Sequence, residues 1–185
     1  FVVGPFYLSQ GLGLDTAHVG AVMSIGPLTA ALTGVPAGRI ADRFGAARMT
    51  VIGLSALTIG CALLATLPAH LGIPGYVVPL VICTLGYALF QTANNTAVMA
   101  EIQAEQRGVV SGMLSLSRNL GLVTGASVMG AIFAFASSGR AASDPGAAAT
   151  GLAVTFAVAT VLMFAALVLA VRSPARALAE PQPGE

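Results

Sequence analysis

Charged side chains are scarce in this sequence. Only 8% of its 185 residues are Asp, Glu, Lys or Arg, and the formal net charge is +1. Proteins that bind nucleic acids usually carry a basic helix, or a basic patch interleaved with aromatic residues, and neither pattern occurs here. We therefore expect no nucleic-acid partner.

The sequence also has few of the groups from which metal and catalytic sites are built. Cys61 and Cys83 lie within apolar runs, and their spacing does not match a metal site. His18 and His70 lie at the edges of loops, and the apolar runs contain no acid apart from Glu101 at the end of one run. We expect no metal and no cofactor. A membrane-embedded enzyme is a remote alternative, because it would need a nucleophile and a base, or metal ligands, at a common depth.

Apolar residues dominate what is present. They make up 56% of the chain, and the mean hydropathy is +0.88, which is unusual for a soluble domain. A bilayer requires roughly 20 apolar residues for each helix. We therefore predict an all-α, polytopic membrane helical bundle. The expected membrane-spanning segments are residues 1–10 (in part), 19–37, 49–69, 75–100, 108–137 and 145–171.

The two ends of the chain are interpreted separately. The first residue is Phe1 rather than Met, so we interpret the chain as a fragment that lacks an N-terminal portion and the start of its first helix. The transmembrane bundle is expected to cover residues 1–172. Residues 173–185 contain three prolines, and this composition predicts a disordered cytoplasmic tail.

The distribution of arginine predicts the orientation of the bundle. Six arginines fall in alternate connections on one side, and one falls on the other side. The six are Arg39, Arg43, Arg48, Arg107, Arg172 and Arg176, and the single one is Arg140. Positively charged connections are retained in the cytoplasm. Residues 38–48 and the C-terminus are therefore expected to be cytoplasmic.

The connection at residues 38–48 is short, charged and flanked by glycine. It resembles the signature loop of the major facilitator superfamily, G-x-L-a-D-r-x-G-r-k. The matching positions are Gly38, Asp42, Arg43 and Gly45, with Ile40 in place of leucine. The resemblance implies the C-terminal six-helix half of such a transporter, in which two three-helix units have inverted topology.

Part of this connection departs from the family pattern. Ala46 and Ala47 occupy the positions of the two expected basic residues, and the nearest positive charge is Arg48. The resemblance implies that Asp42 contacts a helix N-terminus and a neighbouring arginine, and thereby latches one conformational state. The alternative is a solvated Asp–Arg pair of little energetic consequence. We predict that Arg48 belongs to the latch loop with the four matching residues.

The resemblance continues through residues 94–99, 107–113 and 118–121, which look like the corresponding region of bacterial drug:proton antiporters. It implies a secondary transporter in the bacterial inner membrane that exports small molecules or drugs by alternating access. A metabolite or sugar carrier of the same superfamily is the alternative. If protons drive transport, the coupling acid is expected in the missing half of the same chain, because the apolar runs here hold none beyond Glu101.

Arg118 is the candidate for a functional charge within the membrane. It lies ten residues after Gly108, about 15 Å along a helix, and burying such a charge in lipid costs about 2.5–3.5 kcal/mol. The preceding helix is antiparallel, so Gln91 lies at a similar depth. We predict a polar seam that lines or gates the substrate path. Its residues are Gln91, Asn94, Asn95, Ser115 and Arg118. The alternative is that the span begins at Asn119 and Arg118 reaches the cytoplasmic headgroups.

Two G-x-x-x-G pairs occur in the same expected helix. They are Gly108 with Gly112 and Gly121 with Gly125. This spacing lets two helices approach closely, so we predict that these glycines serve helix packing. A gating hinge is the alternative.

Overall fold

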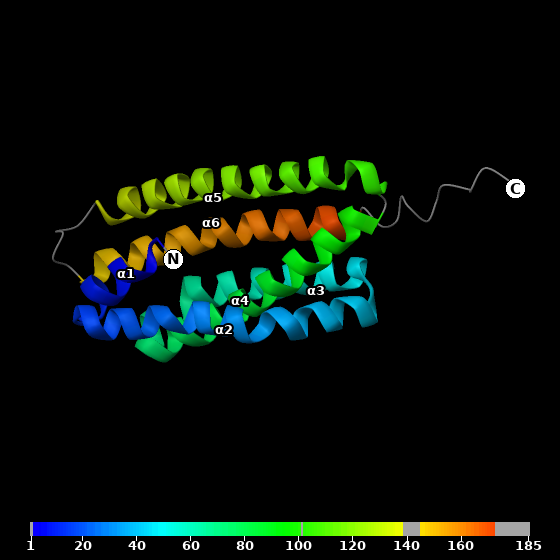
Figure 1. Ribbon diagram of the computed structural model, residues 1–185. Helices are drawn as coiled ribbons and strands as arrows, with labels where there is room; N and C mark the ends of the chain where they lie inside the picture. Colours follow the sequence, from blue (N-terminus) through cyan, green and yellow to red (C-terminus); the bar gives the residue numbers. More distant parts are fainter. Residues whose placement is uncertain (1, 101, 139–144, 173–185) are drawn as a thin grey trace, which may run out of the picture.

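The computed structural model describes residues 2–100, 102–138 and 145–172, which form helices and short connections without any strand (Figure 1). Phe1, Glu101, residues 139–144 and residues 173–185 lie outside this description. The tail predicted for residues 173–185 therefore falls there, as do Arg140 and Arg176, which contributed to the predicted orientation.

Five long helices follow a short N-terminal helical segment. That segment is α1 (Gly4–Phe6) with a π-helical turn, η1 (Tyr7–Gly11). The long helices are α2 (Thr16–Phe44), α3 (Ala46–Thr66), α4 (Pro68–Ala100), α5 (Arg107–Ser137) and α6 (Pro145–Arg172), and a single 3-10 turn, η2 (Ala104–Gln106), precedes α5. Each long helix is apolar enough and long enough to cross a bilayer. The predicted all-α membrane bundle is confirmed.

The connection at residues 38–48 is mostly helical rather than an extended loop. Helix α2 continues to Phe44, and α3 begins at Ala46, so only Gly45 is non-helical between them. Its φ of +86° is a conformation that glycine adopts without steric cost. The Gly45 N–H donates to the Ala41 carbonyl over 3.0 Å, which ends α2. The connection is thus two helix ends joined at one residue.

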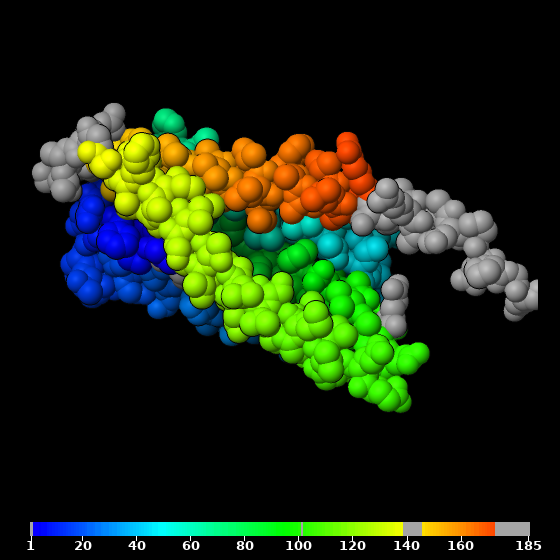
Figure 2. All heavy atoms as spheres, turned by 90° about the horizontal axis from the view of Figure 1, so that it is seen from above, coloured from blue at the N-terminus to red at the C-terminus, as the bar shows by residue number. Residues whose placement is uncertain are grey.

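The helices pack around α3 and α4. Helix α4 contacts both α2 and α3, α3 also contacts α6, and α6 carries α5 on its other side (Figure 1). Seen from above, the C-terminal end of α5 lies against α6, and its N-terminal half diverges from it (Figure 2). No residue of α5 is buried among the described residues. The first half of α5 therefore stands away from the bundle.

Glycine permits the close contact of α3 with α4. A Cβ atom added at Gly53 would lie 2.6 Å from the backbone nitrogen of Phe90, and one added at Gly86 would lie 2.9 Å from the carbonyl oxygen of Gly53. At Gly60 it would lie 2.5 Å from the sulfur of Cys83. Real Cβ atoms essentially never approach other heavy atoms within 3.0 Å. These glycines consequently set the distance between the two helices.

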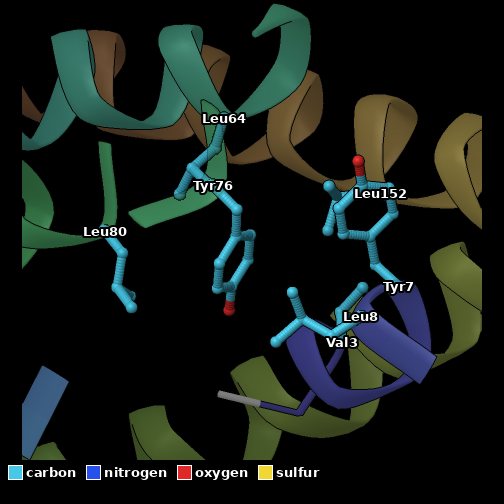
Figure 3. Packing of buried hydrophobic residues seen from close by; sticks show 7 residues of the cluster. All are labelled: Val3, Tyr7, Leu8, Leu64, Tyr76, Leu80 and Leu152. Carbon is cyan, nitrogen blue, oxygen red and sulfur yellow. The ribbon is translucent and has the colours of Figure 1, made fainter. Parts of the chain in front are cut away.

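The largest apolar core packs side chains of the N-terminal segment against those of the long helices (Figure 3). It consists of Val3, Tyr7, Leu8, Leu64, Tyr76, Leu80 and Leu152. The Tyr7 hydroxyl donates to the Pro68 carbonyl over 2.7 Å, which satisfies a polar group that would be costly to bury alone. The core holds the start of the chain against α3, α4 and α6.

Candidate functional site

A cavity of about 370 Å³ lies between the second half of α4 and the first half of α5. Its α5 wall belongs to the half of α5 that diverges from α6 in Figure 2. Helix α4 lines it with Tyr87, Phe90, Gln91, Asn94, Asn95 and Met99. Helix α5 lines it with Ser111, Leu114, Ser115, Ser117 and Arg118. The cavity therefore has polar groups on both walls and some apolar surface.

Helical periodicity explains why these side chains meet. On α5, Ser111, Ser115 and Arg118 are spaced by four and three residues, and so share one face. Gln91 and Asn94 are three residues apart on α4 and share a face in the same way. The structure thus brings together all five residues predicted for the polar seam. Apolar residues and serines are too common in this chain to be informative singly, so the predicted seam did not include the other lining residues, Tyr87, Phe90, Met99, Ser111, Leu114 and Ser117.

Arg118 lies well inside α5. The helix begins at Arg107, is continuous through Arg118 and has 31 residues, so it is about 46 Å long. Its central residue is position 122, and Arg118 lies about 6 Å from it along the axis. If the bilayer is centred on α5, a hydrocarbon core about 30 Å thick encloses Arg118.

The charge of Arg118 is not compensated within the described residues. The single ion pair there joins Asp15 and His18, and Arg118 makes no hydrogen bond. None of the residues lining the cavity is acidic. Glu105, the described acid nearest along the chain, precedes Arg118 by 13 residues, or roughly 20 Å of helix. The cavity therefore carries a net positive charge in the part of the chain that the structure describes.

The predicted latch loop lies at the end of the bundle where α2 ends and α5 begins (Figure 1). Asp42 and Arg43 are exposed in the last turn of α2, and Arg48 is exposed in the first turn of α3. The Arg43 guanidinium carbon lies 5.7 Å from the centroid of the Phe44 ring. Asp42 makes no hydrogen bond or ion pair with any described residue. Its role as a latch stays a prediction.

The α5 glycines lack neighbours in the described structure. A Cβ atom added at Gly108, Gly112, Gly121 or Gly125 would meet nothing within 4 Å, and the same is true at Gly38 in the latch loop. No described helix approaches these four α5 positions closely. Their packing role stays a prediction that needs a further surface. Between α3 and α4, the glycines in close contact are Gly53, Gly60 and Gly86, which the sequence reasoning missed although Gly53 and Gly60 lie two helical turns apart.

The opposite end of α2 has an exposed capping pair. The Asp15 carboxylate accepts the His18 backbone N–H over 3.3 Å and also contacts the His18 ring nitrogen Nδ1. These hydrogen bonds, above all that to the His18 side chain, lower the pKa of Asp15. The sequence signal was available, since an aspartate just before a helix is a favoured N-cap.

Known proteins resemble this chain along most of its length. A family model described as Major Facilitator Superfamily matches residues 1–185. The chain is 31% identical over 125 residues to the Uncharacterized transporter YebQ of Escherichia coli, a match that covers 68% of this chain and 27% of that protein. It is 32% identical over 130 residues to the Riboflavin transporter RibZ of Clostridioides difficile, covering 70% of this chain and 28% of that protein.

A third relative is the Multidrug efflux pump LfrA of Mycolicibacterium smegmatis. It is 28% identical over 132 residues, which cover 69% of this chain and 26% of that protein. The matched region thus spans little more than a quarter of each of these three relatives. No solved structure matches the chain significantly.

Proposed function

Because the chain belongs to the major facilitator superfamily, we propose that it forms part of a secondary transporter that exports small organic molecules by alternating access, in exchange for protons. The observation that carries this proposal is the α4–α5 cavity, whose polar walls include an arginine that no described residue pairs with. An integral membrane bundle has little other use for such a charge, because polar groups within the bilayer are costly unless they serve a function. The multidrug efflux pump among the relatives supports export.

In this proposal the cavity lines one wall of the substrate path. The α3–α4 pair is held at a fixed distance by Gly53 and Gly86, so we propose that it moves as one rigid unit. Helix α5 packs mainly on α6 and contributes no buried residue, so its first half is the element that is free to shift. A substrate held between α4 and α5 would stabilise the conformation that it contacts best.

We further propose that residues 38–48 and the C-terminus face the cytoplasm of a bacterial cell, and that Asp42 latches one state. The Asp42 carboxylate is exposed and pairs with no described residue, which supports a latch whose partner lies elsewhere in the transporter. The other half of the transporter and the coupling acid would lie in a further part of the same protein. Alternating access needs two halves that rock against each other around a shared site.

A metabolite carrier of the same superfamily is a second candidate. The riboflavin transporter among the relatives supports it, because that protein is as similar to this chain as the others are. A riboflavin-like cargo would use the same amides, hydroxyls and aromatic rings of the cavity. The two candidates differ in the cargo and in the direction of transport.

The proposal is tested by dye transport into liposomes that contain the complete transporter. Three dyes cover the charge states: riboflavin is neutral, fluorescein is anionic and rhodamine 123 is cationic. We expect an imposed pH gradient to drive at least one dye across the membrane, and a protonophore to stop it. Failure to move any of the three would contradict the proposed function.

Arg118 variants then connect transport to the cavity. We expect Arg118→Ala to reduce transport of the moved dye at least about tenfold, and Arg118→Lys to restore it only in part, because an ammonium lacks the planar fork of a guanidinium. Arg172→Ala is the matched control, since Arg172 is exposed at the end of α6 and lies outside the cavity. Wild-type transport by Arg118→Lys would instead support an arginine that only reaches the headgroups.

A further inference from the structure

We propose that the α4–α5 cavity selects organic anions, with a carboxylate or phosphate ester of the ligand bound at Arg118. This inference rests on the proposed transport function and adds the class of substrate. It is based on the balance of charge in the cavity, on the chemistry of its two walls and on the depth of Arg118.

The charge balance favours an anion. Arg118 is the single ionisable group among the cavity-lining side chains apart from the Tyr87 phenol, and no described carboxylate pairs with it. A cationic ligand would meet a like charge at close range, and no described acid would offset it. An anionic ligand would instead supply the partner that the guanidinium lacks. Arginine is suited to this role, because its planar fork binds a carboxylate or a phosphate through two parallel hydrogen bonds.

The two walls complete an anion site. Ser111 and Ser115 lie on the Arg118 face of α5, so their hydroxyls can donate to the same anionic group. Gln91 and Asn94 line the facing wall on α4 with amide N–H donors. Phe90 supplies an aromatic surface for the ring or chain of the ligand. A ligand with a charged end and a flat apolar body therefore matches the cavity.

The depth of the site favours a soluble molecule over a lipid headgroup. If the bilayer is centred on α5, Arg118 lies about 6 Å from its midplane, whereas headgroups lie roughly 15 Å from it. An anionic phospholipid would have to draw its headgroup into the hydrocarbon core to reach the guanidinium. A free organic anion can enter along the polar walls instead.

Dye binding to the complete transporter tests the inference. Fluorescein and rhodamine 123 share a xanthene ring system and differ in charge, so their affinities report charge selectivity. We expect fluorescein anisotropy in phosphatidylcholine nanodiscs to give an affinity at least about tenfold higher than that of rhodamine 123. Arg118→Gln should abolish this preference, and the matched variant Arg172→Gln, which removes a positive charge outside the cavity, should retain it.

The outcomes separate this inference from the proposed function. Three results would each overturn the anion site. The transporter could prefer rhodamine 123, it could bind fluorescein no better than Arg118→Gln does, or its preference for fluorescein could survive Arg118→Gln. Loss of fluorescein binding on adding phosphatidylglycerol to the nanodiscs would also overturn it, in favour of a lipid site. Transport of rhodamine 123 alone would support the proposed export function and refute the anion site. Fluorescein binding without transport of any dye would support the anion site and refute the proposed export function.

Discussion

The contact between α3 and α4 gives a quantitative prediction for Gly53→Ala. A Cβ atom at this position would lie 2.6 Å from the Phe90 backbone nitrogen, and the closest contacts of real Cβ atoms are about 3.0 Å. The helices must therefore separate by at least 0.4 Å, the difference between these two distances. Backbone atoms cannot rotate away as a side chain can, so the strain spreads along the whole interface. Overpacking of this kind costs about 1–3 kcal/mol.

Gly34→Ala in α2 is the matched control. A Cβ atom there would meet nothing within 4 Å, and both substitutions gain the higher helix propensity of alanine, about 1 kcal/mol. The difference between the two variants consequently isolates the steric cost. We expect Gly53→Ala to be less stable than Gly34→Ala by about 1–3 kcal/mol.

Thiol reactivity provides the assay. Cys61 is buried in α3 and Cys83 is partly buried in α4, and both are free. In a complete transporter that retains only these two cysteines, a fluorogenic maleimide reports unfolding of the α3–α4 pair during heating. We expect a lower midpoint for Gly53→Ala than for Gly34→Ala.

A double variant sharpens the test. Gly86→Ala acts at the same contact, because its Cβ atom would lie 2.9 Å from the Gly53 carbonyl oxygen. Once the helices have separated for one alanine, the second needs little further movement. The combined cost should therefore be smaller than the sum of the two single costs. Equal midpoints for Gly53→Ala and Gly34→Ala, or fully additive costs, would refute the rigid α3–α4 contact.

Three further predictions concern the ends of the helices. If Asp42 is a latch, Asp42→Asn should reduce transport at unchanged membrane abundance. Unchanged transport would instead indicate that Asp42 is a solvated side chain. A cysteine placed at Ser138 should react with an impermeant thiol reagent added outside intact cells, and a cysteine placed at Ala47 should not. The reverse result would overturn the proposed orientation. The hydrogen bond with His18 lowers the pKa of Asp15. At pH values above the ordinary aspartate pKa, the Asp15 cap should therefore stabilise α2, and this stabilisation should be lost as the pH falls through the lowered pKa. Amide exchange in the first turn of α2 should follow this change, and Asp15→Asn should remove the pH dependence.

The sequence by itself determined the class of protein and five of the residues in the cavity walls. Long apolar runs can satisfy their backbone hydrogen bonds in a bilayer only as helices or closed barrels, and their length predicts helices. Spacings of three and four residues place Ser115 with Arg118, and Gln91 with Asn94, on common faces through local geometry alone. Because a short connection joins the antiparallel helices α4 and α5, Gln91 and Arg118 lie at a similar depth. All of these relations depend on residues that are close in the chain, which is why they could be predicted.

The tertiary structure decided which faces have neighbours. The spacing of Gly121 and Gly125 is as favourable for helix contact as any in the chain, yet these two glycines meet no described neighbour, whereas Gly53, Gly60 and Gly86 pack closely. A glycine pattern states that a close approach is possible, and only the arrangement of the other helices provides the partner. The divergence of α5, which opens the cavity beside Arg118, arises in the same way from its packing on α6. Contacts between residues far apart in sequence have no local periodicity, and therefore leave no signal in a single chain.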